Sequence, residues 1–457
     1  MPGLFTTLTS ASNALGAQSY GLDVTGQNIA NVNTEGYTRR QLDLAERPNP
    51  YGMGGVDILG VHSTRDAFVD TRLRNELPSQ SYDNARSGQL SSIESTLGAA
   101  GSSIDGALSA LFGSFGALAV DPQSSVQRDG VVLQAGRLTK MFNDMAGRLD
   151  TARREADAQV RNTVPQINAL SAKIAELNQR IGDANGVDTG ALTDELNLSL
   201  QNLSKLTQVS VINHPEGTVD VSTGSGRALV VGAHGYALSV ASAPSTGFAQ
   251  IRAGGVDITS ELRGGALGGF VDIRDTTIPK YQTQLDQLAY DVGQQVNTVH
   301  AGGYDLSGTP GAAFFAPLAS AAGAAAALKV DPAIAADSSK IAASKTGAAG
   351  DNGTAQDLAA LRDANVASGG TTTFIGSWST FVNNVANDSA DAQSSLKTRD
   401  DIVTSIQKLR DSVEGVSLDE EAGRLMQYQR AYEANAKFFS AVNSTLSTLM
   451  GIFGAGQ

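Results

Sequence analysis

The sequence predicts a mostly helical protein that carries one inserted antiparallel β module. Three observations lead to this fold class. Apolar residues recur every seven positions near both ends of the chain, long internal stretches repeat a helical period, and short alternating stretches cluster around residues 206–270. We therefore expect paired N- and C-terminal coiled-coil helices, a long helical-bundle body and a small outer β domain.

The clearest helical pattern lies at residues 417–453. Its stripe consists of two sets of positions that each repeat every seven residues: Leu418, Leu425, Tyr432, Phe439, Leu446 and Phe453, and then Tyr428, Asn435, Val442 and Leu449. Such a stripe is typical of a helix that buries one narrow seam against another helix. Ser417 and Glu420 have the spacing of a capping box, in which the serine hydroxyl caps the helix and the glutamate reaches back to the serine amide.

The expected partner is a second helix at residues 4–31. Its stronger set of seam positions is Leu8, Leu15, Leu22 and Ile29, and its weaker companion set is Leu4, Ala11, Gln18 and Thr25. A single helix of this kind is marginally stable in water, so we expect it to become ordered on packing. Residues 31–37 favour a tight reversal, because Asn and Gly adopt turn conformations readily.

These patterns predict which residues form the helix seams and the assembly contacts. The predicted set is Leu8, Leu15, Leu22, Ile29, Asn31, Gly36, Tyr37, Leu418, Leu425, Tyr428, Arg430, Tyr432, Asn435, Phe439, Val442, Leu446 and Leu449. An ordinary intramolecular coiled coil would use the same apolar seams. We favour an additional role between copies, because seam residues on a terminal helix serve both purposes when neighbours pack around a ring.

Between the ends, the helical period indicates a bundle of antiparallel helices. Short strands are expected at residues 41–44 and 56–61. Helical stretches are predicted from residue 66 to a Gly/Ser-rich break at 98–106, at 138–181, at 285–299 and at 391–413. Pro165 is expected to kink or divide the second of them. The Gly- and Ala-rich stretch 302–373 gives no assignment.

The inserted module begins near Val209, where the period changes from helical to alternating. Strands are predicted at residues 209–212, 218–221, 228–231, 236–240 and 249–252. The predicted division of the chain is terminal helices at 1–45 and 415–457, a helical-bundle body with short strands at 46–205 and 271–414, and the β module at 206–270. From this nesting we expect the β module to lie furthest from both termini.

Composition excludes several classes of partner. The formal net charge of −13 argues against nucleic acid and against an anionic membrane surface. No stretch is apolar for long enough to span a bilayer, and no Lys or Arg precedes Arg39, so a cleavable signal peptide is not expected. The protein therefore either stays in the cytoplasm or leaves by a route that does not use such a signal. The absence of cysteine is compatible with both.

The sequence predicts no catalytic, cofactor or metal site. The four histidines, His62, His214, His234 and His300, are scattered and lack converging ligands. Helix capping explains the acidic run at residues 419–421 more simply than a metal site does. The run at 224–226 is a fragment of a phosphate-binding pattern without a following helix, and a turn accounts for it.

Two stretches resemble the terminal signatures of bacterial flagellar rod, hook and hook-associated proteins. Residues 26–39, GQNIANVNTEGYTR, resemble the N-terminal signature. Residues 416–422, VSLDEEA, with residues 428–436, YQRAYEANA, resemble the C-terminal one. The LDEE opening is most similar to the hook-associated members, and the internal stretches 167–178, 264–275, 303–306 and 350–352 agree with them. One departure is TDELNL at residues 193–198, where the family usually has a DQRD run.

The resemblance implies a structural adaptor in the first ring of the hook–filament junction, outside the cell. It implies export through the flagellar type III apparatus, a cytoplasmic chaperone on the C-terminal helix, and terminal helices that line a central channel. The implied partners are hook protein, a second junction protein (hook-associated protein 3) and further copies of the chain. A rod or hook subunit is the first alternative, although the bodies of those proteins are dominated by β structure. A flagellum-associated wall hydrolase is the second.

Overall fold

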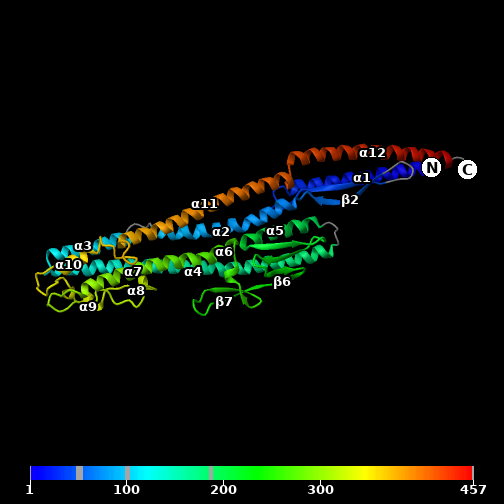
Figure 1. Ribbon diagram of the computed structural model, residues 1–457. Coiled ribbons are helices and arrows are strands. Elements are labelled where there is room, and N and C mark those ends of the chain that lie inside the picture. Colours follow the sequence, from blue (N-terminus) through cyan, green and yellow to red (C-terminus); the bar gives the residue numbers. More distant parts are fainter. Residues whose placement is uncertain (1, 48–54, 98–102, 185–188, 455–457) are drawn as a thin grey trace.

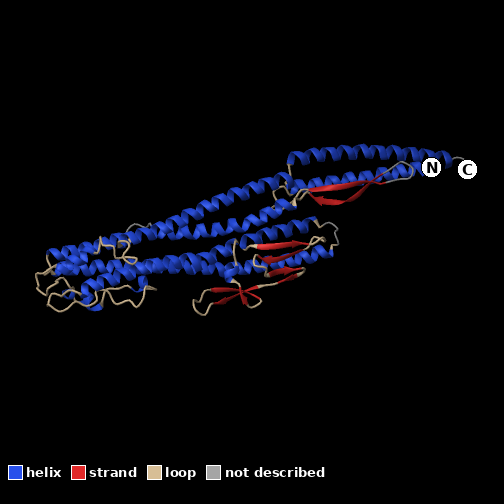
Figure 2. Cartoon of the chain, viewed as in Figure 1, coloured by secondary structure: helices blue, strands red, loops and turns tan. Residues whose placement is uncertain are grey.

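The computed structural model describes residues 2–47, 55–97, 103–184 and 189–454. The molecule is long and narrow (Figure 1): both chain ends lie at one pole, and the helical body extends to the other. Helices dominate, and the strands form small groups along one flank (Figure 2). These features confirm the predicted fold class. In the described part of the chain, no helix is both long and apolar enough to cross a membrane.

At the pole that holds the termini, α1 (Pro2–Ala30) packs against α12 (Leu418–Gly454). The two helices run in opposite directions, and we call them the terminal pair (Figure 1). Strands β1 (Arg40–Arg47) and β2 (Gly55–Ser63) form an antiparallel hairpin that also contacts α1. The pairing of the two chain ends is therefore confirmed.

Five helices build the body. They are α2 (Ala67–Leu97), α3 (Ile104–Val120), α4 (Ser125–Asp183), α7 (Ile278–Ala301) and α11 (Phe374–Glu414). Helix α4 runs through Pro165, so this proline does not divide it. Helix α11 begins at Phe374 instead of near residue 391, because Trp378, Phe381 and Val385 continue its buried face toward the N-terminus.

Short elements complete the body. They are α5 (Gly190–Leu206), η1 (Thr259–Glu261), α6 (Gly265–Asp272), the π-helical turn η2 (Ile273–Thr277), α8 (Ala324–Ala327), α9 (Pro332–Ala336), η3 (Ser338–Lys340) and α10 (Gly353–Ala360). The last four occupy the stretch 302–373, which the sequence left unassigned. They lie at the far pole beside α3 (Figure 1), where Phe314, Phe315 and Leu328 join the main core.

The β module consists of two antiparallel sheets instead of one. The first has the order β3 (Val209–Asn213), β4 (Val219–Thr223), β5 (Ala228–Val231) and β6 (His234–Gly235). The second has the order β7 (Leu238–Ser242), β8 (Ala249–Ala253) and β9 (Val256–Asp257). Two asparagines of α4 fasten them: Asn178 donates to the carbonyl of Val219 (2.6 Å) and Asn168 to that of Leu238 (2.8 Å).

The expected position of the β module was wrong. The sheets flank the middle of the molecule beside α4, and α3 with α8–α10 forms the pole opposite the termini (Figure 1). The reason is the length of α4. At 59 residues it spans about 90 Å, and it turns the chain back toward the termini before the first strand of the module begins.

Candidate functional site at the terminal helix pair

Two contacts define how α1 meets α12. The side-chain amide of Asn28 donates to Oε2 of Glu421 (3.0 Å). One heptad earlier in α1, Gly21 lies against the Tyr428 ring, which is one heptad later in α12. A Cβ at residue 21 would lie 2.6 Å from Cε1 of that ring. The helices therefore pack closely and antiparallel, and successive contacts between them are seven residues apart on each helix.

The buried face of α1 differs from the predicted one. The stronger set, Leu8, Leu15, Leu22 and Ile29, is only partly buried. The fully buried residues of α1 are mostly small or polar, and they include Ala11, Gly21, Thr25 and Asn28. Ala11 and Thr25 of the weaker companion set, together with Gly21 and Asn28, which belong to neither set, thus supply more of the close contact than the leucines do, because a small side chain lets the two backbones approach.

The predicted positions on α12 divide into two groups. Val442 is buried, and Leu425, Tyr428, Asn435, Phe439, Leu446 and Leu449 are partly buried. Leu418 and Tyr432, which share the predicted stripe, are 52% and 41% exposed, and Arg430 is also exposed. Phe453 lies outside the residues whose burial is described. The helix therefore turns only part of its predicted stripe toward α1.

The predicted reversal after α1 is held by side-chain hydrogen bonds. The Tyr37 hydroxyl donates to Oδ1 of Asn28 (2.8 Å), and the Asn31 amide donates to the carbonyl of Gln27 (2.9 Å). Gly36 has φ +80° and packs on Leu198 of α5, where a Cβ would lie 3.2 Å from the leucine Cβ. Glycine is required at this position because other residues rarely adopt that backbone conformation.

We call the region where the terminal pair meets the body the neck; it comprises residues 36–40, 64–70, 194–198 and 410–421. Arg39 is at its centre. Its guanidinium contacts the carboxylates of Glu421 (2.9 Å) and Glu420 (3.0 Å), and its backbone N–H donates to the carbonyl of Glu414 (2.9 Å). The two terminal signatures, far apart in the sequence, thus meet in one ionic network.

The predicted capping box is half present. The backbone N–H of Glu420 donates to the Ser417 hydroxyl, but at a long 3.5 Å. The Glu420 carboxylate pairs with Arg39 instead of reaching back to Ser417, because the guanidinium offers a charged donor. Glu421, interpreted in the sequence as a favourable charge at the helix start, is fully buried.

A second arm of the neck joins α5 to the start of α2. Arg65 contacts Asp194 (2.7 Å) and Asp70 (3.2 Å), and Arg40 lies 3.8 Å from Asp194. Burial raises the pKa of Asp194 above its ordinary value, while the charge of Arg65 opposes that rise. Asp194 belongs to the stretch that departs from the family pattern, so this chain uses a carboxylate there to hold the neck.

Glu414 closes the neck at the end of α11. Its carboxylate accepts the backbone N–H of Asp66 (2.8 Å) and lies 3.5 Å from Nε of Arg410. Burial raises the pKa of Glu414 to about 7, although the hydrogen bond from Asp66 opposes the rise. This carboxyl group therefore changes charge near neutral pH at the junction between α11 and α12.

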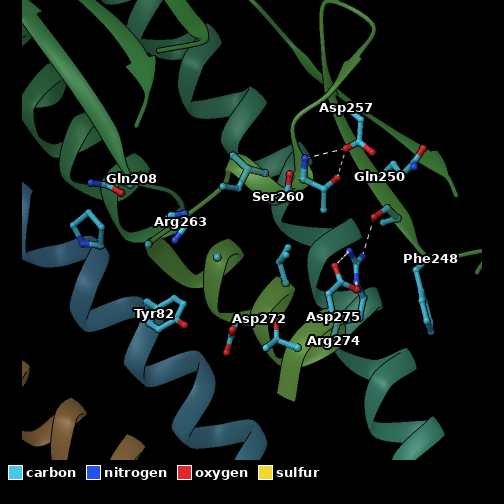
Figure 3. A pocket seen from close by; sticks show the side chains of 18 of the residues that line it. Tyr82, Gln208, Phe248, Gln250, Asp257, Ser260, Arg263, Asp272, Arg274 and Asp275 are labelled. Atoms are coloured by element: carbon cyan, nitrogen blue, oxygen red, sulfur yellow. Dashed lines mark hydrogen bonds and ion pairs between the residues drawn. The ribbon is translucent and has the colours of Figure 1, made fainter. Parts of the chain in front are cut away.

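A groove of about 800 Å³ lies between α2 and the β module (Figure 3). Several charged side chains that line it form ion pairs: Arg274 with Asp157 (2.6 Å) and Asp275 (2.7 Å), and Asp272 with Arg86 (3.1 Å). Among the residues that the structure describes, no cluster of three or more His, Cys, Asp or Glu has the geometry to hold a metal ion.

The four histidines remain separate in the fold. His62 pairs with Asp43 (2.7 Å) in the hairpin, and His214 pairs with Asp220 (3.1 Å) in the first sheet. His234 is exposed on β6, whereas His300 is fully buried at the far pole.

Comparison with known proteins gives a consistent assignment. Residues 8–38 match the flagella basal body rod protein family. Residues 90–315 match the helical domain of flagellar hook-associated protein FlgK, and residues 412–452 match the C-terminal family of flagellar basal body rod FlgEFG proteins. The two rod-type matches cover most of the terminal pair, and the FlgK match covers much of the body and the β module.

Full-length relatives agree. The chain is 26% identical to flagellar hook-associated protein 1 of Salmonella typhimurium, over 97% of this chain and 99% of the relative. It is 26% identical to the Bacillus subtilis protein of that name, over 100% of both. The flagellar hook junction protein FlgK from Burkholderia pseudomallei has the same fold, with a TM-score of 0.68 at 18% identity over 75% of this chain and 100% of that one.

The terminal pair, the neck that joins the two signatures and the rod-type matches at both ends define a structural protein of the bacterial flagellar axis. Within that class, the chain belongs to the flagellar hook-associated protein 1 family. Members of this family are structural proteins of the hook–filament junction in the extracellular flagellum, and they are not enzymes.

Proposed function

We propose that this chain is an adaptor subunit that joins hook to filament, and that its copies assemble into a ring through their terminal pairs. Hook protein would contact one side of the ring, and hook-associated protein 3 would contact the other. The domain division predicted from the sequence then has a functional meaning: residues 1–45 and 415–457 form the axial core, and the body and β module surround it.

The tip of the terminal pair, residues 2–22 and 438–454, is the observation that carries this proposal. Neither stretch contains Asp, Glu, Lys or Arg. Large apolar side chains nevertheless face outward there, with Phe5 53%, Phe438 49% and Met450 62% exposed. An uncharged surface with exposed aromatic and methionine side chains is typical of a surface that another protein covers. Copies related by rotation would cover it repeatedly.

Export fits the same picture. We propose that the chain travels unfolded through the flagellar type III apparatus, with a cytoplasmic chaperone on α12 before export. The seam between α1 and α12 consists largely of small and partly buried side chains, which supports late ordering of the terminal pair. A chaperone on α12 would cover the exposed Met426, Tyr432 and Phe438 until assembly.

A rod or hook subunit remains the second candidate, because the models that match both ends are rod-type families. Such a subunit would extend a polymer of its own kind. The helical body and its match to the FlgK helical domain favour the junction adaptor.

The test compares two sets of substitutions on otherwise unaltered full-length chains. One set is Phe5→Ser, Phe438→Ser and Met450→Ser in the tip. The control set is Val120→Ser, Val126→Ser and Leu133→Ser, which are at least as exposed but lie in the body. We expect the tip set to abolish addition to isolated hooks, counted by electron microscopy, while the melting temperature of the body stays unchanged. Loss of binding in the body set alone would contradict assembly through the terminal pair.

A further inference from the structure

The repeat that pairs α1 with α12 leaves their relative register open. On α12 the seam positions recur every seven residues, and on α1 the two predicted sets, which lie beside the line through Gly21 and Asn28, do the same. A slide of one heptad would therefore bring side chains of similar kind back into contact. Sequences with this property need a specific contact to select one register, and a buried polar pair is the best-attested device.

Asn28 is such a contact. It is 1% exposed, and every polar group of its side chain is engaged. Its amide nitrogen donates to Glu421 (3.0 Å) and to the carbonyl of Arg40 (2.9 Å), while its oxygen accepts from the Tyr37 hydroxyl (2.8 Å) and from the backbone N–H of Arg40 (3.0 Å). These bonds fix the end of α1, the reversal and the start of the hairpin to one another.

Glu421 supplies the other half of the contact. It is fully buried, and its two oxygens are divided between Arg39 (2.9 Å) and Asn28 (3.0 Å). A slide of one heptad would place Glu421 opposite Gly21, which has no side chain to donate, or beyond the end of α1. A buried carboxylate without its donors is strongly unfavourable, so both slides are penalised.

A steric contact favours the same register. The Tyr428 ring occupies the space that a side chain at residue 21 would need. A slide would place this ring opposite Ala14 or Asn28, and both carry a Cβ. The register in the structure is thus the one in which the large aromatic residue of α12 meets the glycine of α1.

We propose that the Asn28–Glu421 pair, positioned by Arg39 and assisted by the contact of Gly21 with Tyr428, selects the heptad register of the terminal pair. One heptad corresponds to about 10 Å along a helix. An error of this size would displace the tip of one helix past the other. The consequence for ring assembly rests on the function proposed above, but the register itself does not.

The cysteine-free chain makes the register measurable by disulfide trapping. The two observed contacts, continued by heptads, place residue 7 opposite residue 442. Thr7→Cys with Val442→Cys therefore reports the register of the structure, and Ala14→Cys with Val442→Cys reports a slide of one heptad. Each cysteine pair is introduced into the full chain and oxidised under identical conditions.

The decisive background is Asn28→Leu with Glu421→Leu, because apolar replacement of a buried polar pair preserves packing while removing register selection. The matched control is Glu420→Gln, since Glu420 contacts the same arginine at 3.0 Å but is 61% exposed. In the control background and in the unaltered chain, we expect the 7–442 disulfide to dominate.

In the double-leucine background, we expect the ratio of 14–442 to 7–442 disulfide to rise by at least about tenfold. The reason is that loss of the hydrogen bonds of a buried carboxylate penalises the shifted register by more than a tenfold change in population requires, and the leucines remove this penalty. An unchanged ratio with intact helix content would overturn the proposal. If circular dichroism shows lost helix in that background, Glu421→Gln is measured instead, since it keeps the shape and removes the charge. A ratio equal to that of Glu420→Gln would then overturn the proposal as well.

Discussion

Gly21 of α1 lies directly against the ring of Tyr428 in α12, and a Cβ at residue 21 would lie 2.6 Å from Cε1 of that ring. Real Cβ atoms do not approach other atoms so closely. The ring would have to move, or the helices would have to separate locally. The same contact explains why the small residues of α1 are more deeply buried than its leucines.

Gly21→Ala should therefore destabilise the terminal pair, by about 1–3 kcal/mol, as overpacking does in other close contacts. Amide hydrogen exchange of α1 measures the effect. Gly16→Ala is the matched control on the same helix, because nothing lies within 4 Å of its added Cβ. The control should be neutral or slightly stabilising, since alanine favours helix over glycine. Equal protection of α1 in both variants would contradict the close packing at residue 21.

The neck should weaken as the pH rises through neutrality. The pKa of Glu414 is raised from 4.5 to about 7 in the fold, so the folded state holds this proton more tightly than the unfolded state does. The contribution is fully present below pH 4.5 and is lost as the pH rises through about 7. A rise of that size corresponds to at most about 3 kcal/mol.

Glu414→Gln isolates this effect, because the amide keeps the shape but never ionises. Between pH 4.5 and pH 8, the free energy of unfolding of the variant relative to the unaltered chain should increase by up to about 3 kcal/mol. Urea denaturation at several pH values measures it. Asp411→Asn, an exposed acid on the same helix, serves as the matched control for removal of a carboxylate. A flat difference for Glu414→Gln would show that its carboxyl group titrates normally.

His300 should give the opposite pH dependence at the far pole. Its Nδ1 lies 2.6 Å from the carbonyl of Ala312, and its Nε2 accepts the backbone N–H of Ala342 (2.8 Å), so the neutral ring satisfies both groups. Burial lowers its pKa from 6.5 to about 4. The contribution to stability is therefore present above pH 6.5 and is lost as the pH falls through about 4.

His300→Phe keeps the ring but leaves the carbonyl of Ala312 and the N–H of Ala342 without partners. We expect it to cost about 2–4 kcal/mol at pH 7, because two buried polar groups lose their hydrogen bonds. His234→Phe, on the exposed strand β6, should change stability by less than about 0.5 kcal/mol. Similar melting temperatures for both variants at pH 7 would contradict a structural role for His300.

Arg430→Glu should weaken addition to isolated hooks without lowering the stability of the body. Arg430 is exposed on α12, so its charge faces outward from the terminal pair. Arg72→Glu is the control, an exposed arginine on the body helix α2. The fraction of hooks that acquire the protein, counted by electron microscopy, distinguishes them. Normal addition of the Arg430 variant would exclude this residue from the interface.

Periodicity in the sequence was sufficient for the main architecture. The seven-residue repeats at both ends predicted the terminal pair, and the switch to alternation near Val209 predicted the strands. Periodicity was less informative about which side of a helix is buried most. On α1 it favoured the leucines, whereas close approach at Gly21 buries the smaller residues, and that depends on the partner ring of Tyr428.

The neck could not be predicted, because its central contacts, such as Arg39 with Glu421 and Asp66 with Glu414, join residues hundreds of positions apart. Glu421 looked like a favourable charge at a helix start, and only the fold brings Arg39 and Asn28 to it. Asp194 gave no signal for the same reason. The start of α11 was missed because its buried aromatic residues are interleaved with Ser, Thr and Asn, which dilute the helical pattern.

The most direct test of the account mixes the unaltered full-length protein with isolated hooks and locates it by electron microscopy. An adaptor of the hook–filament junction should add density at one end of each hook and then stop. Tubes formed by this protein alone would indicate a rod or hook subunit, and absence of binding at hook ends would contradict the proposed role in the junction.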